Sequence, residues 1–255
     1  MKMLLDIGNS MTKICLNKGI SIKNIKKIEN KKIKDYEKNL KNILVNFKKN
    51  KIEKIFISSV NLKILNITKK TIRKIFPQLD VKILKNYDFK NFKIKYKEIH
   101  KFGSDRFFNC IGAKYILNNK NLIIIDIGTA TTVDVVSSDF EYLGGQIFSG
   151  PLTSYSTLIS NTSMIGNHDL LISKKILGKS TAQCLSSGFI YSNSIMFEGL
   201  VKKIQKEYNK KFQTLITGGL SNIFSKFLPK DFIIDQELTL KGIMFYINEI
   251  NRSKI

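Results

Sequence analysis

Two short segments of this chain repeat a pattern that suits the binding of phosphate and cations. Residues 4–13 read Leu-Leu-Asp-Ile-Gly-Asn-Ser-Met-Thr-Lys and residues 124–133 read Ile-Ile-Asp-Ile-Gly-Thr-Ala-Thr-Thr-Val, with a Thr six places after each Asp. Glycine lets the chain reverse tightly and lets a ligand approach the backbone. The N–H groups and hydroxyls of such a turn suit phosphate oxygens, and the Asp suits a cation or its bound water. Each segment is a candidate phosphate turn, and the repetition favours this interpretation over an ordinary hairpin turn.

A third candidate site is the tetrapeptide Gly103-Ser104-Asp105-Arg106, which precedes the apolar run 107–117. In one interpretation this is the start of a helix, with Ser104 or Asp105 as the N-cap. In the other, Asp105 is a carboxylate at the mouth of a cleft, beside the fixed cation Arg106. The residue choice supports the second interpretation, because the chain otherwise uses lysine for nearly all of its 43 basic residues.

The remaining chemistry-bearing residues predict neither a zinc site nor a disulfide framework. Cys15, Cys110 and Cys184 are far apart without Cys-x-x-Cys spacing, so we expect buried free thiols. The two histidines, His100 and His168, form no metal-ligand pattern, and a surface or hydrogen-bonded role is expected for both. The sequence also lacks a Walker motif and a Gly-x-Gly-x-x-Gly motif, so other nucleotide-binding folds are unsupported.

Alternating strands and helices must position these candidate segments. The apolar patterns predict strands over 2–8, 11–18, 55–60, 81–84, 121–126, 133–136 and 232–234, and helices over 36–47, 62–75, 107–117 and 238–250, with another helix beginning at Pro151. This alternation is typical of an α/β fold. Because the candidate phosphate turn occurs twice, we expect two similar lobes, residues 1–117 and residues 118–255.

Glycine pairs mark three further features of the second half. Gly144 and Gly145 lie inside a strand pattern, which predicts a bulge or a close backbone approach. A long helical pattern beginning near residue 178 contains Gly188 and Gly199, so we expect this helix to pack tightly against another, either within the chain or across a dimer interface. The segment 215–221 is a strand that enters a Gly-Gly turn, a place for the base or ribose of a nucleotide.

The strong positive charge does not by itself predict nucleic-acid binding. A formal charge of +23 is the electrostatic signature of phosphate-backbone binding. However, the lysines are spread through the chain with Asn and Ile, whereas direct base readout favours arginine. We therefore expect no specific nucleic-acid partner. The sequence shows neither a membrane span nor a signal-peptide pattern, so a soluble cytoplasmic protein is expected.

Taken together, the two Asp-x-Gly turns and the late Gly-Gly turn resemble the ATPase fold shared by actin, sugar kinases and heat-shock chaperones. That resemblance implies two duplicated ribonuclease-H-like lobes with a nucleotide cleft between them. The residues of these motifs and their order are similar to those of type III pantothenate kinases, over nearly the whole chain. The resemblance rests on residues 6–10, Tyr96, residues 103–106, residues 126–132, residues 143–145, Gly178, Thr181, residues 187–188 and residues 217–219.

The resemblance implies a role for each matching residue. The segment Asp6, Ile7, Gly8, Asn9, Ser10, Met11, Thr12 and Lys13 would hold the ATP phosphates. Within it Asp6 would lie near a divalent ion such as Mg²⁺. Thr129 would contact the nucleotide, and Asp126 would bind a monovalent cation, K⁺ or NH₄⁺. Residues Gly103, Ser104, Asp105 and Arg106 would line the pantothenate pocket, which Tyr96 and Thr181 would also contact, and Asp105 would be the general base.

The implied activity is ATP-dependent phosphorylation of pantothenate by a homodimer, the first step of coenzyme A synthesis. Two alternatives remain open: a kinase of another small hydroxylated metabolite on the same fold, and a non-catalytic regulator. The chain departs from the family pattern at Ile99, Ser149, Met164, Ile165 and Ser221, which affects loop rigidity and leaves the candidate catalytic set intact.

Overall fold

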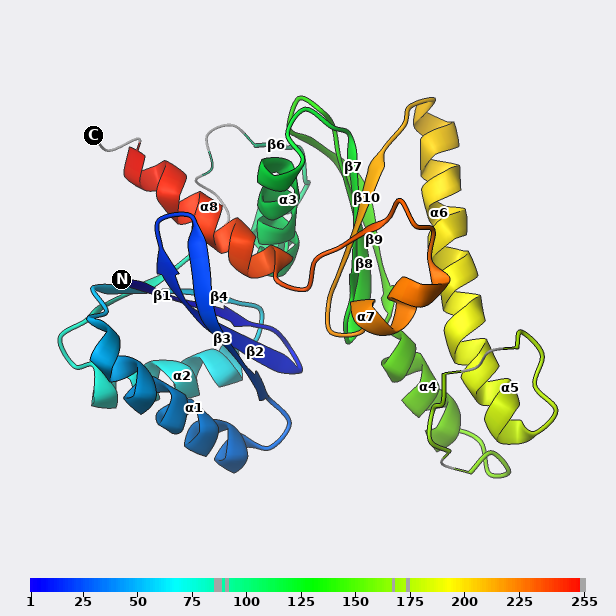
Figure 1. Cartoon of the computed structure of the whole chain (residues 1–255), viewed down its shortest axis with the longest axis horizontal. Helices are drawn as coiled ribbons and strands as arrows, with labels where there is room; N and C mark the ends of the chain where they lie inside the picture. The colour runs from blue at the N-terminus through cyan, green and yellow to red at the C-terminus, as the bar shows by residue number, and fades with distance from the viewer. Residues whose placement is uncertain (85–88, 90–91, 167, 173–174, 253–255) are drawn as a thin grey trace. The chain divides into compact units, whose positions relative to one another are not determined.

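The computed structural model describes residues 1–84, 89, 92–166, 168–172 and 175–252, and it divides into two compact units (Figure 1). The first unit comprises Met1–Leu117 together with Glu237–Ile255, and the second comprises Asn118–Gln236. The segment from Glu237 onward, which the sequence analysis placed in the second lobe, therefore belongs to the first unit.

Close backbone packing explains why the last helix joins the first unit. Helix α8 (Leu238–Arg252) lies against α3 (Ser104–Ile116). A Cβ atom on Gly242 would lie 1.8 Å from the carbonyl oxygen of Phe108, and one on Gly112 would lie 2.6 Å from that of Leu238. Only glycine permits this approach, and the sequence offers it on both helices.

The sheet of the first unit has the strand order β3-β2-β1-β4-β5. Its strands are β1 (Lys2–Ile7), β2 (Met11–Lys18), β3 (Ser21–Glu29), β4 (Lys54–Ser59) and β5 (Asp80–Ile83). Strand β1 pairs antiparallel with β2 and parallel with β4. Its odd-numbered side chains Met3, Leu5 and Ile7 belong to one buried cluster, whereas Asp6 lies on the opposite face. The alternation therefore delivers Asp6 to the end of the strand outside that cluster.

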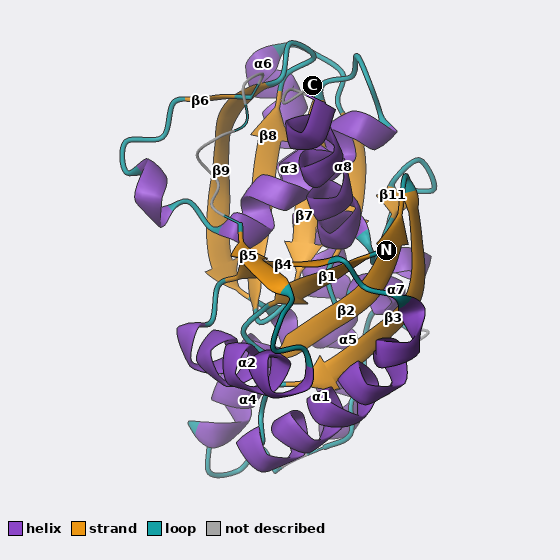
Figure 2. Ribbon diagram, turned by 90° about the vertical axis from the view of Figure 1, so that its left-hand side faces the viewer, coloured by secondary structure: helices purple, strands orange, loops and turns teal. Residues whose placement is uncertain are grey.

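Helices α1 (Ile33–Phe47) and α2 (Leu62–Ile75) lie side by side along one face of this sheet (Figure 1, Figure 2). Their apolar residues, including Tyr36, Leu40, Leu44 and Ile72, complete the buried cluster. Three short elements lie in the segments between the longer ones: the 3₁₀ helices η1 (Lys48–Asn50) and η2 (Ile99–Lys101), and the two-residue strand β6 (Lys93–Ile94).

In the second unit the strands lie in the order β11-β10-β7-β8-β9. They are β7 (Leu122–Ile127), β8 (Ala130–Val136), β9 (Glu141–Ser149), β10 (Gln213–Thr217) and β11 (Ile233–Ile234). Strand β7 pairs antiparallel with β8 and parallel with β10, as β1 does with β2 and β4. The register between β8 and β9 shifts next to Gly144, which has a φ of 143°, so the predicted bulge is confirmed.

The helices of the second unit are α4 (Pro151–Ser160), α5 (Thr181–Ser187), α6 (Asn193–Tyr208) and α7 (Ser221–Phe224), with the 3₁₀ helix η4 (Ser225–Phe227). The predicted long helix is interrupted by one π-helical segment, η3 (Gly188–Ser192). Nothing lies within 4 Å of a Cβ atom placed on Gly188 or Gly199. The expected tight packing of these glycines therefore does not occur among the residues that the structure describes.

Candidate functional site

The first turn is a tight hairpin between β1 and β2. Ile7 pairs with Thr12, and the N–H of Gly8 donates a 3.0 Å hydrogen bond to the carbonyl oxygen of Met11. Asn9 and Ser10 lie exposed at the tip. The turn therefore presents backbone groups at the carboxyl end of β1, where the sequence analysis expected a phosphate to bind.

Asp6 lies at the same strand end, directly opposite Lys13 in the antiparallel pair. Directly opposed residues of antiparallel strands project from the same face. The parallel neighbour of Asp6 on β4 is Ser58, which is almost fully buried. Carboxylate, ammonium and hydroxyl groups therefore gather on the face of the sheet opposite to the α1–α2 side.

Asn30, which the sequence analysis did not single out, is bonded to the first turn through both its side chain and its backbone. Its side-chain Nδ2 donates to the carbonyl oxygen of Gly8 at 2.8 Å, and its backbone N–H donates to that of Ser10 at 2.9 Å. Its Oδ1 accepts a 2.8 Å hydrogen bond from Thr12 Oγ1. No motif marks Asn30, because its role arises from the pairing of β2 with β3.

The second turn is one residue shorter than the first. Ile127 pairs with Thr131, and the N–H of Gly128 donates to the carbonyl oxygen of Ala130 at 3.2 Å, so Thr129 alone forms the tip. The carbonyl oxygen of Thr129 is fixed by the N–H of Gly150 at 3.0 Å and by Thr153 Oγ1 at 2.7 Å.

The register also corrects the alignment of the two repeats. By spacing, the counterpart of Thr12 is Thr132, but in the structure the fully buried Thr12 corresponds to the fully buried Thr131. Lys13 then corresponds to Thr132, opposite Asp126. The missing turn residue shifts the match by one position, so only the first hairpin opposes its Asp with a cation.

Gly218 packs closely on Asp126 in the second unit. A Cβ atom at this glycine would lie 2.5 Å from Asp126 Oδ1 and 2.5 Å from the carbonyl oxygen of Ile127. Gly218 also has a φ of 93°, which side chains rarely tolerate. The backbone N–H of Leu220 donates to the carbonyl oxygen of Ile127 at 3.1 Å. The Gly-Gly turn is therefore joined to the Asp126 turn.

The segment containing Asp105 begins a helix, as one interpretation expected, but neither Ser104 nor Asp105 is the N-cap. Helix α3 begins at Ser104, with Gly103 as its N-cap. Within the first turn, Asp105 Oδ1 accepts a 2.8 Å hydrogen bond from the N–H of Arg106. Burial raises the pKa of the Asp105 carboxyl, against the opposing effects of that N–H and the Arg106 charge. A carboxyl of raised pKa is a stronger base once ionised.

Arg106 is buried, with its guanidinium over the ring of Phe102. Its Cζ lies 4.9 Å from the centroid of the Phe102 ring, and the Phe102 ring is 5.2 Å from that of Tyr96. Cation–π contact of this kind stabilises a guanidinium removed from water. The structure thus joins Tyr96 to the Gly103–Arg106 segment. The last predicted substrate residue, Thr181, is exposed at the first position of α5 in the second unit.

The cysteines differ from expectation at one position. All three are free, and Cys15 and Cys110 are buried as predicted, but Cys184 is exposed. Burial raises the pKa of Cys15 to about 12, so its thiol is unreactive at neutral pH.

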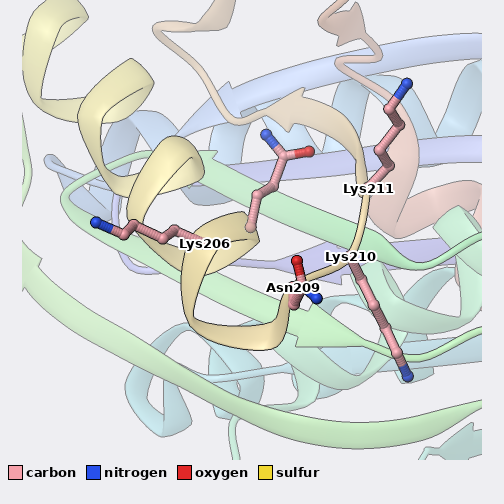
Figure 3. Close-up of a pocket in the computed structure, with 5 residues that line it drawn as sticks. Lys206, Asn209, Lys210 and Lys211 are labelled. Carbon is pink, nitrogen blue, oxygen red and sulfur yellow. The ribbon is translucent and has the colours of Figure 1, made fainter.

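A hollow of about 430 Å³ lies elsewhere, at the C-terminal end of α6. It is lined by Gln205, Lys206, Asn209, Lys210 and Lys211, and Figure 3 shows the three lysine side chains pointing in different directions. These residues precede β10, whereas the Gly-Gly turn follows it. The hollow therefore lies at the opposite end of the strand from the candidate turn, and its ammonium groups do not converge on a ligand.

Two features that the described residues lack bear on the kind of site. No group of three or more His, Cys, Asp or Glu residues there could hold a metal ion. An ion bound at Asp6 or Asp126 would therefore take its other ligands from backbone, hydroxyl, water or phosphate oxygens. No helix in the described part of the chain is long and apolar enough to cross a membrane.

Residues 2–203 match the sequence model of the type III pantothenate kinases. The chain is 35% identical over 260 residues to a type III pantothenate kinase of Sulfurihydrogenibium sp. (strain YO3AOP1), covering 96% of this chain and 98% of that protein. It is 34% identical to the corresponding protein of Pelagibacter ubique (strain HTCC1062), covering 94% and 95% of the two chains.

Solved structures share the fold at lower sequence identity. A Baf family transcriptional activator from Campylobacter jejuni is 23% identical, covers 98% of this chain and 99% of its own, and gives a TM-score of 0.61. A 2-dehydro-3-deoxygalactonokinase protein from Sinorhizobium meliloti is 11% identical over 98% and 99% of the two chains, with a TM-score of 0.59. These similarities show a two-lobed, actin-like ATPase fold, as the sequence predicted.

Proposed function

The chain belongs to the type III pantothenate kinase family, and from this membership we infer that it phosphorylates pantothenate with ATP. The product is 4'-phosphopantothenate, and the reaction is the first step of coenzyme A synthesis. The observation that carries the assignment is a family match over residues 2–203, together with relatives of 34–35% identity that span almost the whole chain. The enzyme is therefore a kinase, and a cytoplasmic location suits this metabolic role.

Asp105 is the proposed general base. In this role the ionised carboxylate accepts the proton of the primary hydroxyl of pantothenate while that oxygen attacks the γ-phosphorus of ATP. The bond between the γ-phosphorus and the β,γ-bridging oxygen breaks, and ADP leaves with the electron pair. The raised pKa of Asp105 supports this role, and the hydrogen bond from the N–H of Arg106 fixes one carboxylate oxygen.

Gly103, Ser104, Arg106, Tyr96 and Thr181 are proposed to bind pantothenate. The guanidinium of Arg106, held beneath Phe102, supplies a fixed positive charge next to the base. Phe102 also contacts Tyr96, so displacement of Tyr96 would shift Phe102 and, through it, the position of Arg106. These contacts support the placement of one side of the pocket on the segment that precedes and begins α3.

The first turn is the proposed site for the ATP phosphates, from Asp6 to Lys13. A tight turn with an exposed tip and a cation opposite Asp6 offers backbone N–H groups and charge neutralisation. A single carboxylate such as that of Asp6 is sufficient for Mg²⁺, which is commonly held by one or two carboxylates while waters and phosphate oxygens supply its other ligands. Bound there, the ion would neutralise phosphate charge.

The second turn is proposed to contact the nucleotide through Thr129 and a monovalent cation through Asp126. Oxygen atoms crowd this turn: Asp126 Oδ1 and the Ile127 carbonyl oxygen both lie close to Gly218. Carboxylate and carbonyl oxygens suit hard cations, so this donor set fits K⁺ or NH₄⁺. Bound there, the cation would offset the negative charge of the nucleotide.

The protein is proposed to act as a homodimer. Large apolar side chains are exposed on α4, on the segment preceding α5 and on α6: Leu152, Leu158, Ile176, Leu177, Ile195 and Met196. Where exposed apolar side chains form one patch, they mark an interaction site. The open space over Gly188 and Gly199 would let a second copy of the chain approach the η3–α6 backbone. Sedimentation of the purified protein should give a dimer mass, and Ile195→Glu should give a monomer, whereas Ile20→Glu, at a still more exposed position of the first unit, should not. A monomeric wild type at micromolar concentration would contradict the dimer.

A coupled assay of ATP consumption with pantothenate tests the activity. Turnover should require pantothenate and should be higher with potassium than with sodium. Folded protein without turnover in either salt would overturn the kinase assignment. Turnover that is indifferent to potassium would remove only the role of Asp126. Faster turnover with another hydroxylated metabolite would favour the alternative kinase.

The second candidate function is regulation, because one structural relative is described as a transcriptional activator and the chain carries a charge of +23. That likeness shows the fold alone. Binding of duplex DNA that survives physiological salt, together with absent turnover, would favour the regulator, since non-specific binding weakens steeply as salt rises.

A further inference from the structure

The hydrogen bonds of Asn30 continue into the core of the first unit. Thr12, which donates to Asn30 Oδ1, is fully buried. Burial raises the pKa of Tyr36, and hydrogen bonds to Thr12 and Thr68 oppose that effect. Thr68 in turn donates to the carbonyl oxygen of Ile64 on α2. A buried chain of polar groups therefore runs from α2 through α1 to the first turn.

This chain fixes the orientation of the Asn30 amide. Thr12 Oγ1 lies 2.8 Å from Oδ1, and the Gly8 carbonyl oxygen, which can only accept, lies 2.8 Å from Nδ2. The opposite orientation would place two acceptors together at Gly8, so the network determines which amide atom faces the turn.

The direction of these bonds determines where the N–H groups of the turn point. In a planar trans peptide the C=O and the following N–H point in opposite directions. Asn30 draws the carbonyl oxygens of Gly8 and Ser10 toward itself, so the N–H groups of Asn9 and Met11 point away from Asn30. N–H groups presented together on one side of a turn make an anion-binding surface.

We propose that Asn30 is a positioning residue for nucleotide binding, because it holds the first turn with its N–H groups directed toward the phosphates of ATP. The proposal rests on the function proposed above. Asn30 itself touches the turn rather than the nucleotide. Its loss should therefore weaken ATP binding without impairing the recognition of pantothenate.

The test compares Asn30→Ala with a matched control in the same β2–β3 hairpin. Asn17 is also buried, and its Nδ2 donates to the carbonyl oxygens of Gly19 and Ser21 at the far end of that hairpin. For Asn30→Ala we expect the Kd of the non-hydrolysable analogue AMPPNP, measured with Mg²⁺ by calorimetry, to rise at least about tenfold, as expected when a buried acceptor loses its donor. The KM for ATP should rise in parallel, while the KM for pantothenate stays within about twofold of the wild-type value. Asn17→Ala should leave all three values close to wild type.

A second pair of variants covers the case in which Asn30→Ala does not fold. Thr12→Ser keeps the hydroxyl that orients the amide, and Thr12→Val removes it at nearly constant volume. Weaker AMPPNP binding in Thr12→Val, with recovery in Thr12→Ser, would support the proposal. Wild-type AMPPNP binding in Asn30→Ala, or in Thr12→Val where Asn30→Ala does not fold, would overturn it, as would an equal loss of binding in Asn17→Ala. Failure of the wild-type protein to bind AMPPNP would instead contradict the proposed function.

Discussion

Ser58 Oγ donates a 3.0 Å hydrogen bond to Ser104 Oγ and so joins the end of β4 to the first residue of α3. Ser58 is also the parallel neighbour of Asp6 on β1, and Ser104 directly precedes Asp105. One hydrogen bond therefore connects the strand end that carries the first turn with the helix that carries the proposed base. This relationship lies wholly within the first unit.

The first prediction concerns this hydrogen bond. Ser58→Ala should lower the free energy of unfolding by about 1 kcal/mol, the usual contribution of one hydrogen bond, because Ser58 is buried. In a double-mutant cycle with Ser104→Ala, the coupling free energy should be about 0.5–1 kcal/mol. Urea denaturation measures both quantities. Additive effects of the two substitutions would show that the serines contribute separately.

The second prediction concerns Asp105→Asn. The substitution keeps the acceptor for the N–H of Arg106 but cannot take a proton, so kcat should fall by about 10²–10⁴, the usual contribution of a general base. The same variant should unfold at a higher temperature than the wild type at pH 7, because burial disfavours the ionised carboxylate. Unchanged turnover would remove the catalytic role, and a lower melting temperature would show that the charge is well accommodated.

The third prediction is the pH dependence that follows from the raised pKa of Asp105. Its folded pKa lies above the ordinary value of 3.8, so protonation of this group stabilises the folded state. That stabilisation is complete below pH 3.8 and is lost as the pH rises through the folded pKa. The stability difference between Asp105→Asn and the wild type should therefore shrink as the pH falls toward 3.8. The kcat/KM of the wild type should fall on the acid side through the folded pKa, and this limb should be absent in Asp105→Asn.

The sequence predicted the elements whose patterns are set locally. The strand at 11–18, helix α2 and the start of α8 were placed correctly, because apolar periodicity marks all three and Pro77 marks the end of α2. Strand β3 was missed, because it is an edge strand with exposed lysines that obscure the alternation of apolar residues. The membership of α8 in the first unit was not predicted. It depends on close packing of α8 against α3 at Gly242 and Gly112, and a local sequence pattern does not reveal a contact between two helices.

The candidate site likewise contains features that a local pattern predicts and features that depend on strand pairing. The two Asp-Ile-Gly turns could be found from composition and spacing alone. Their register could not, since the second turn lacks one residue and pairs Thr131 with Ile127. The role of Asn30 could not be predicted either, because a single Asn in a lysine-rich stretch contacts the first turn only when β2 and β3 pair.

The fourth prediction compares Gly218→Ala with Gly219→Ala. At Gly218 the φ of 93° should cost about 1–3 kcal/mol for a residue with a Cβ atom. The Cβ atom would also lie 2.5 Å from Asp126 Oδ1, so the carboxylate must move. At Gly219 nothing lies within 4 Å of an added Cβ atom, and the change in unfolding free energy should stay within about 0.5 kcal/mol.

Since Asp126 is the proposed ligand of the monovalent cation, Gly218→Ala should also raise the potassium concentration that gives half-maximal turnover, whereas Gly219→Ala should leave it near the wild-type value. A folded Gly218→Ala enzyme with unchanged potassium dependence would show that the position of Asp126 does not control the cation.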